Sequence, residues 1–148
     1  MDPDRVMEGS SGAGPDPVEF TAALENDSSS IAEARRLTVG FLTRLQTEHG
    51  MPVTARAMDL AQLVVSELVT NAYKYAHGPA LLCLRLVDAV VEIEVWDSDP
   101  VLPAARAADP GRIGQHGLEI VMAVVEKFTA RQESVGKRLT ASLPLLLS

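Results

Sequence analysis

Two polar side chains interrupt an otherwise apolar helical pattern in residues 58–77. Successive residues of a helix are rotated by about 100°, so Glu67 and Asn71 lie one turn apart on the same surface. Around them the pattern places Leu60, Leu63, Val64, Leu68 and Tyr75 on one broad face. A carboxylate and an amide in such a face cost free energy unless each has a partner.

Two interpretations of Glu67 and Asn71 are open. They could be a structural pair that backbone groups or water satisfy. They could also be part of a site for a hard cation and its ligand. Magnesium prefers oxygen donors and keeps several waters, and the Asn71 carbonyl could supply one ligand. Glu67 could then accept a proton from a nucleophile. Because both residues lie on the same apolar face, the sequence favours the cation site.

Two further segments could complete the same site. Asp97 ends an expected strand, where its carboxylate can accept a hydrogen bond from an exocyclic amine such as that of adenine, although Asp also commonly begins a turn. Gly114 and Gly117 lead into an expected helix, and the N–H groups at a helix N-terminus suit phosphates. Glycine also ends loops for steric reasons. Taken together, the four features predict one ligand site.

Composition limits the possible functions. The chain has 148 residues, enough for one domain with a proper core, and 47% of them are apolar. A formal charge of −7 argues against nonspecific nucleic-acid binding and favours a protein partner with a basic patch. The single cysteine, Cys83, excludes an internal disulfide framework or zinc site; it is expected to be core and suits a reducing cytoplasm. No apolar run has transmembrane length.

The order of expected elements predicts the fold. Residues 1–16 read as a disordered leader without a secretory signal, and residues 17–148 as the folded domain. The expected strands are 17–24, 80–87, 90–97, 128–133 and 137–143. The expected helices are 31–48, 54–76 and 117–127, with residues 101–115 as a long loop. This order predicts an α+β two-layer sandwich, in which three helices cover one face of a mixed, mostly antiparallel sheet.

Local signals fix several boundaries of these elements. Ser30 and Glu33 match a capping box, and Gly50 ends the first helix. Thr54 is expected to cap the second helix. The pair Asp88-Ala89 joins a hairpin, and residues 134–136 turn the last one. The expected inward side chains of the third helix are Leu118, Val121, Met122 and Val125.

Four segments resemble a known superfamily. Residues 66–72 (Ser-Glu-Leu-Val-Thr-Asn-Ala) resemble the N-box of the GHKL (Bergerat-fold) ATPases, which include gyrase B, histidine kinases and MutL. Residues 97–100 and 114–121 resemble the two glycine boxes, and residues 136–140 the turn before the last strand. The residues of these motifs are most similar to those of the anti-sigma-factor serine kinases of bacterial partner-switching systems. The resemblance covers about residues 18–145.

The resemblance implies ATP and Mg²⁺ as cofactors and a role for each matched residue. Asn71 would hold Mg²⁺, Glu67 would be the catalytic base and Asp97 would bind the adenine amine. Gly114 and Gly117 would approach the phosphates. Further nucleotide contacts are expected from Lys74, His116, Leu118 and Thr140. Lys137 could also reach the phosphates, although Lys137 and Lys74 could equally be solvated side chains.

The resemblance also implies partners. A kinase of this branch phosphorylates a serine of an anti-anti-sigma (STAS-domain) protein, binds a sigma factor and usually forms a homodimer in the cytoplasm, without direct contact to nucleic acid or membrane. The alternative is a non-catalytic binding module that sequesters a sigma factor or antagonist. Intact Glu67 and Asn71 favour the kinase. Asp99 and Gln115, which depart from the glycine boxes, favour the module.

Overall fold

The computed structural model describes residues 18–76, 78–99 and 116–147. The expected leader and the whole of the expected loop 101–115, with Gly114 in it, lie outside the described residues. The strands are β1 (Glu19–Leu24), β2 (Ala80–Val87), β3 (Val90–Asp97), β4 (Lys127–Glu133) and β5 (Gly136–Pro144). The helices are α1 (Ser29–His49), α2 (Ala55–Tyr75) and α4 (His116–Val124).

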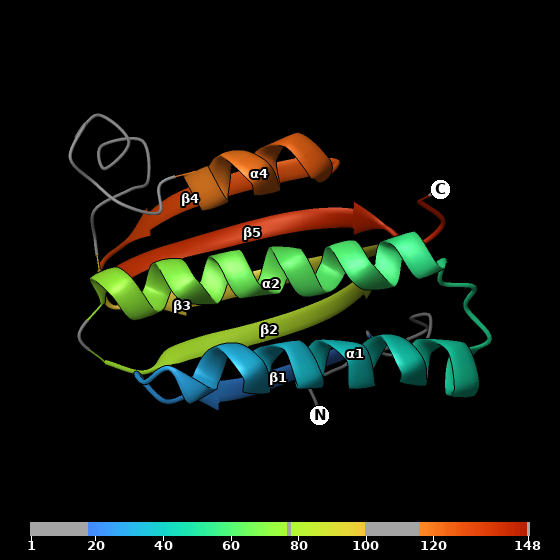
Figure 1. The fold of residues 1–148 in the computed structure, drawn as a ribbon, viewed down its shortest axis with the longest axis horizontal. Coiled ribbons are helices and arrows are strands. Elements are labelled where there is room, and N and C mark those ends of the chain that lie inside the picture. The colour runs from blue at the N-terminus through green and yellow to red at the C-terminus, as the bar shows by residue number, and fades with distance from the viewer. Residues whose placement is uncertain (1–17, 77, 100–115, 148) are drawn as a thin grey trace, which may run out of the picture.

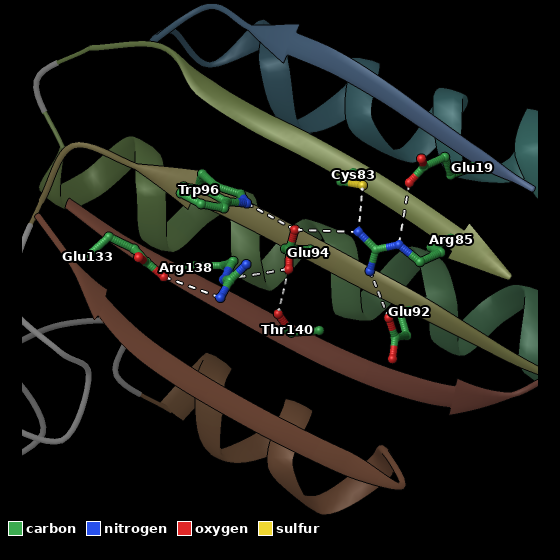
Figure 2. A network of polar contacts seen from close by, with 9 residues as sticks. All are labelled: Glu19, Cys83, Arg85, Glu92, Glu94, Trp96, Glu133, Arg138 and Thr140. Carbon is green, nitrogen blue, oxygen red and sulfur yellow. Dashed lines mark hydrogen bonds and ion pairs between the residues drawn. The ribbon is translucent and has the colours of Figure 1, made fainter. Parts of the chain in front are cut away.

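The five strands form one sheet in the order β1-β2-β3-β5-β4, and every pairing between them is antiparallel. All three helices lie on the same face of this sheet (Figure 1), and the opposite face carries no helix of the described chain (Figure 2). The predicted α+β sandwich is therefore confirmed. The strand predicted at residues 17–24 is an edge strand, as expected, while β3 lies in the centre.

Alternation along β3 separates the two faces of the sheet. Val91, Ile93 and Val95 are fully buried toward the helices. Glu92, Glu94 and Trp96 point to the opposite face, which we call the open face; Glu92, Glu94 and Trp96 are drawn on it in Figure 2. A strand with this alternation has one face on the core and one face toward solvent. By the same alternation Asp97, at the end of β3, lies on the helix side.

The helix ends follow the predicted signals except at the start of α1. Gly50 ends α1 at φ 63°, and the Thr54 hydroxyl accepts the N–H of Ala57 at 3.1 Å, both as predicted. The predicted capping box is wrong, because α1 begins at Ser29 and Ser28 is its N-cap without a side-chain bond. Asp27 takes the capping role: its carboxylate accepts the Ser29 N–H at 2.9 Å.

Fewer side chains of the short helix α4 are buried than the sequence predicted. Leu118 and Val121 are buried, as expected, whereas Met122 is 52% exposed, so the prediction for Met122 is wrong. The helix ends at Val124 and packs against α2 and the edge strand β4. An edge position offers cover on one side only, which leaves the flank of α4 that carries Met122 in solvent.

The rest of the apolar core lies between the helix layer and the sheet. Ala61, Val64, Leu68 and Val69 of α2 belong to it, whereas Leu60 and Leu63 lie at its margin. The face of α2 that is most deeply buried is therefore rotated slightly from the predicted one. None of the described helices combines the length and apolar composition that a bilayer-spanning helix needs.

Gly136 holds the turn between β4 and β5 against the end of β3. Its φ is 137°, and a Cβ there would lie 1.9 Å from the carbonyl oxygen of Asp97. We expect Gly136→Ala to lower the free energy of unfolding by about 1–3 kcal/mol, because both the dihedral and the backbone contact oppose a side chain. Urea unfolding measures this change.

The matched control is Gly40→Ala in the interior of α1. A Cβ at Gly40 meets nothing within 4 Å. This substitution is expected to raise the free energy of unfolding by about 0.5–1 kcal/mol, since alanine loses less backbone entropy than glycine in a helix. Equal effects of the two substitutions would contradict the role given to Gly136.

Candidate functional site

Asn71 carries a buried carbonyl oxygen without a partner. The residue is 7% exposed, and its Oδ1 atom accepts no hydrogen bond from the described residues. One turn earlier on α2, Glu67 is half-buried. A buried acceptor without a partner costs about 1–3 kcal/mol, so such atoms usually have a specific reason. The interpretation of Asn71 as one of a pair satisfied by nearby backbone is therefore not supported.

Gly117 brings the N-terminus of α4 against Glu67. A Cβ on Gly117 would lie 1.9 Å from Glu67 Oε1 and 3.0 Å from its Cδ. A side chain at this position would have to displace the Glu67 carboxylate. The first turn of a helix presents backbone N–H groups and the positive end of the helix dipole, which favour anions. The structure therefore places Glu67 beside the start of α4, with Asn71 one turn further along α2.

Asp97 is part of a buried ion cluster. Lys137 Nζ lies 2.8 Å from Asp97 Oδ2 and 3.6 Å from Asp99 Oδ2. The other oxygen of Asp97 accepts the backbone N–H of Asp99 at 2.9 Å. The side chains of Lys137 and Asp97 are 0% and 1% exposed. Removing one partner of such a buried pair costs about 3–5 kcal/mol, because the other charge is left uncompensated.

Lys137 therefore differs from both sequence interpretations. Its side chain is not solvated, and its ammonium is paired with Asp97 rather than free to bind phosphate. Lys137 is the largest fully buried side chain among the described residues. A signal for this position exists in the sequence. Lys137 alternates with Leu139, Ala141 and Leu143, which all face the core. The β3–β5 pairing then sets Lys137 directly beside Asp97.

The other predicted nucleotide contacts are dispersed. Lys74 is exposed on α2, and Leu118 is a core residue. Thr140 lies on the open face, where its hydroxyl donates to Glu94 Oε2 at 3.0 Å, so the sheet separates it from Asn71 (Figure 2). His116 is the first residue of α4.

A second polar cluster covers the open face (Figure 2). Arg85 donates to Glu92 at 2.8 Å and lies 3.9 Å from Glu94. The hydrogen bond with Glu92 raises the pKa of Arg85 above its ordinary value, and burial opposes this shift. Arg138 stacks 4.8 Å from the centre of the Trp96 ring and pairs with Glu94 and Glu133. Each guanidinium of this network is paired with more than one carboxylate, so its carboxylates outnumber its guanidiniums.

Cys83 belongs to this open-face cluster. It is buried, as predicted, but its sulfur lies 3.4 Å from Arg85 Nη2 rather than in the apolar core. A cavity of about 310 Å³ lies at one end of the open face. Its lining includes Ala23, Leu81, Trp96, Ser98 and Val135. This cavity reaches the strand end at Asp97 from the side away from Asn71.

We expect Asn71→Ala to leave the free energy of unfolding unchanged or to raise it slightly. The substitution removes an unpaired buried acceptor and gains helix propensity of about 0.5 kcal/mol. The control is Asn26→Ala, because the Asn26 amide donates to the Ala76 carbonyl at 3.2 Å. That loss should cost about 0.5–1.5 kcal/mol. A marked destabilisation by Asn71→Ala in thermal unfolding would show that its carbonyl has a structural partner.

Comparisons with known proteins agree with this arrangement. The family model described as Histidine kinase-like ATPase domain matches residues 24–143. The histidine kinase domain of the blue-light activated histidine kinase from Erythrobacter litoralis EL346 superposes with a TM-score of 0.50 at 15% identity. The alignment covers 76% of this chain and 61% of that chain, so this chain spans less than two thirds of the relative's length. At that identity the likeness shows the fold alone.

A second solved structure is the Acinetobacter baumannii histidine kinase AdeS. It superposes with a TM-score of 0.49 at 14% identity, over 86% of this chain and 68% of that chain. The comparison with curated proteins finds no match.

Proposed function

Because the chain belongs to the histidine kinase-like ATPase domain family, we propose that it binds ATP with Mg²⁺ and acts as an anti-sigma factor. In this proposal it transfers the γ-phosphoryl group to a serine of an anti-anti-sigma (STAS-domain) protein. Membership of this family supports the proposed binding of ATP. The motif resemblance of residues 66–72 supports the narrower assignment to a partner-switching kinase, including a sigma-factor partner and a homodimer.

One observation supports this proposal above the others. The Asn71 carbonyl oxygen is buried, has no partner among the described residues and lies one turn from a carboxylate. An amide oxygen is a ligand that Mg²⁺ accepts in proteins. The helix N-terminus at Gly117 supplies N–H groups for phosphate beside the same carboxylate. The residues present therefore fit a magnesium triphosphate.

Each of these residues has a distinct task in the proposed reaction. Asn71 would hold Mg²⁺, and the first turn of α4 would orient the phosphates. Glu67 would accept the proton of the serine hydroxyl on the partner protein. The serine oxygen would then bond to the γ-phosphorus as ADP leaves. Bound Mg²⁺ would supply neutralisation of the phosphate charge. Phosphoryl transfer depends mainly on positioning and charge neutralisation, so these groups are sufficient.

A second candidate function is the non-catalytic binding module. The observation that favours it is the buried Lys137–Asp97 pair, because the acceptor expected to bind adenine already has an internal partner. A module of this kind would capture a sigma factor without phosphoryl transfer. The net charge of −7 suits a basic partner surface in either case.

Nucleotide binding is expected to stabilise the fold. At a concentration one hundred times the dissociation constant, Mg-ATP should add about 2.7 kcal/mol to the free energy of unfolding. Thermal unfolding with ATP, with and without Mg²⁺, measures this effect. Asn71→Ala should remove the part of the stabilisation that depends on Mg²⁺. A midpoint unmoved by Mg-ATP would contradict the proposal.

Glu67→Gln is expected to slow phosphoryl transfer by about 10²-fold or more, because a general base contributes roughly that factor. The measurement is incubation with radiolabelled ATP, Mg²⁺ and a STAS-domain protein, followed by detection of label on its serine. Gly117→Ala should have a similar effect, since its Cβ displaces the flexible Glu67 carboxylate.

Two controls separate loss of the base from general damage. Glu126→Gln removes one carboxylate from an exposed residue and should leave transfer unchanged. Both Glu67→Gln and Gly117→Ala should still bind Mg-ATP. Capture of a sigma factor without any transfer by the unsubstituted chain would favour the non-catalytic module.

A further inference from the structure

Lys137 pairs with the Asp97 carboxylate, the group that the family resemblance assigns to the adenine amine. The Lys137 ammonium lies 2.8 Å from Asp97 Oδ2 and 3.6 Å from Asp99 Oδ2. Asp97 Oδ1 receives the Asp99 N–H. Both oxygens of Asp97 therefore accept a hydrogen bond from within the chain.

We propose that Lys137 is an internal substitute for the amine of a nucleotide base, so that this chain binds nucleoside triphosphates through their magnesium and phosphates with little preference for adenine. The proposal rests on the nucleotide binding proposed above. It adds a specificity-determining residue, Lys137, which acts on the base end of the site.

The chemistry of the two donors supports this assignment. An ammonium–carboxylate hydrogen bond joins two opposite charges and is roughly twice as strong as a neutral one. The exocyclic amine of adenine is a neutral donor. An amine that displaced Lys137 from Asp97 would leave a buried ammonium without its counter-charge, which is the most costly form of burial. Lys137 is also tethered, so it competes without loss of translational freedom.

The two ends of the site are independent in the structure. Glu67 lies on α2 beside Gly117 at the start of α4, and Asn71 lies one turn further along α2. The Lys137–Asp97 cluster joins the ends of β3 and β5. Occupation of Asp97 by Lys137 therefore leaves the metal and phosphate groups unchanged. Asp99 gives the ammonium a second carboxylate, so the internal pair is held by two negative charges.

The test is calorimetric titration of the full chain with Mg-ATP and with Mg-GTP. The unsubstituted chain should bind the two with affinities within threefold of each other. Lys137→Thr should raise the affinity for ATP at least tenfold, which is about 1.4 kcal/mol, without a matching gain for GTP. Arg138→Thr is the matched control, because it removes the same charge from the adjacent residue on the open face.

A second variant protects the test against misfolding. Lys137→Thr leaves the Asp97 and Asp99 carboxylates without the ammonium between them, and their repulsion can unfold the chain. The double variant Asp99→Asn/Lys137→Thr removes one of these carboxylates as well. Its affinities for Mg-ATP and Mg-GTP are compared in the same way.

Two results overturn the proposal, and they differ. An unsubstituted chain that prefers ATP tenfold or more, or an ATP/GTP ratio unmoved by both Lys137 variants, overturns the role of Lys137 and leaves the proposed function intact. Absence of heat with every nucleotide and every folded variant overturns the proposed function and this inference together.

Discussion

The layer between the helices and the sheet excludes water, so each polar group placed there needs a partner. This constraint separates two sets of buried polar groups. Lys137, Asp97 and Asp99 satisfy one another at the ends of β3 and β5. Asn71 on α2 presents a carbonyl oxygen that no described residue satisfies. A buried acceptor that lacks a partner costs free energy and usually has a specific reason. The position of Asn71 is therefore the strongest indication of a ligand.

Two glycines set the geometry of the two ends of the site. Gly117 allows α4 to approach the Glu67 carboxylate, and Gly136 allows the last hairpin to approach the Asp97 carbonyl. The two positions differ in how well they tolerate a Cβ, because the flexible Glu67 carboxylate can move aside whereas a backbone carbonyl in a sheet cannot. Substitution at Gly117 is therefore expected to change the position of the Glu67 carboxylate, and substitution at Gly136 to change stability.

The sequence was most informative where one local rule decides the structure. The end of α1 at Gly50 and the Thr54 cap were both predicted correctly, since each depends on neighbours a few residues away. The capping box failed because Asp27 competed for the same N–H groups, and Met122 failed because burial depends on where α4 meets the sheet edge. The partner of Asp97 is 40 residues distant, so only the β3–β5 register identifies it.

The open face obeys a weaker form of the same constraint. Each guanidinium in the network around Glu94 is paired with carboxylates, but solvent reaches Arg85 and Arg138. Each pair therefore contributes little to stability and can be exchanged for contacts with another molecule. The helix side lacks that freedom, because Lys137 cannot leave Asp97 without a buried charge remaining. Open-face contacts can therefore change with a partner, whereas the helix side must keep its pairs. The two faces of the sheet therefore differ in how freely their polar contacts can be rearranged, because only the buried pairs leave an uncompensated charge when they separate.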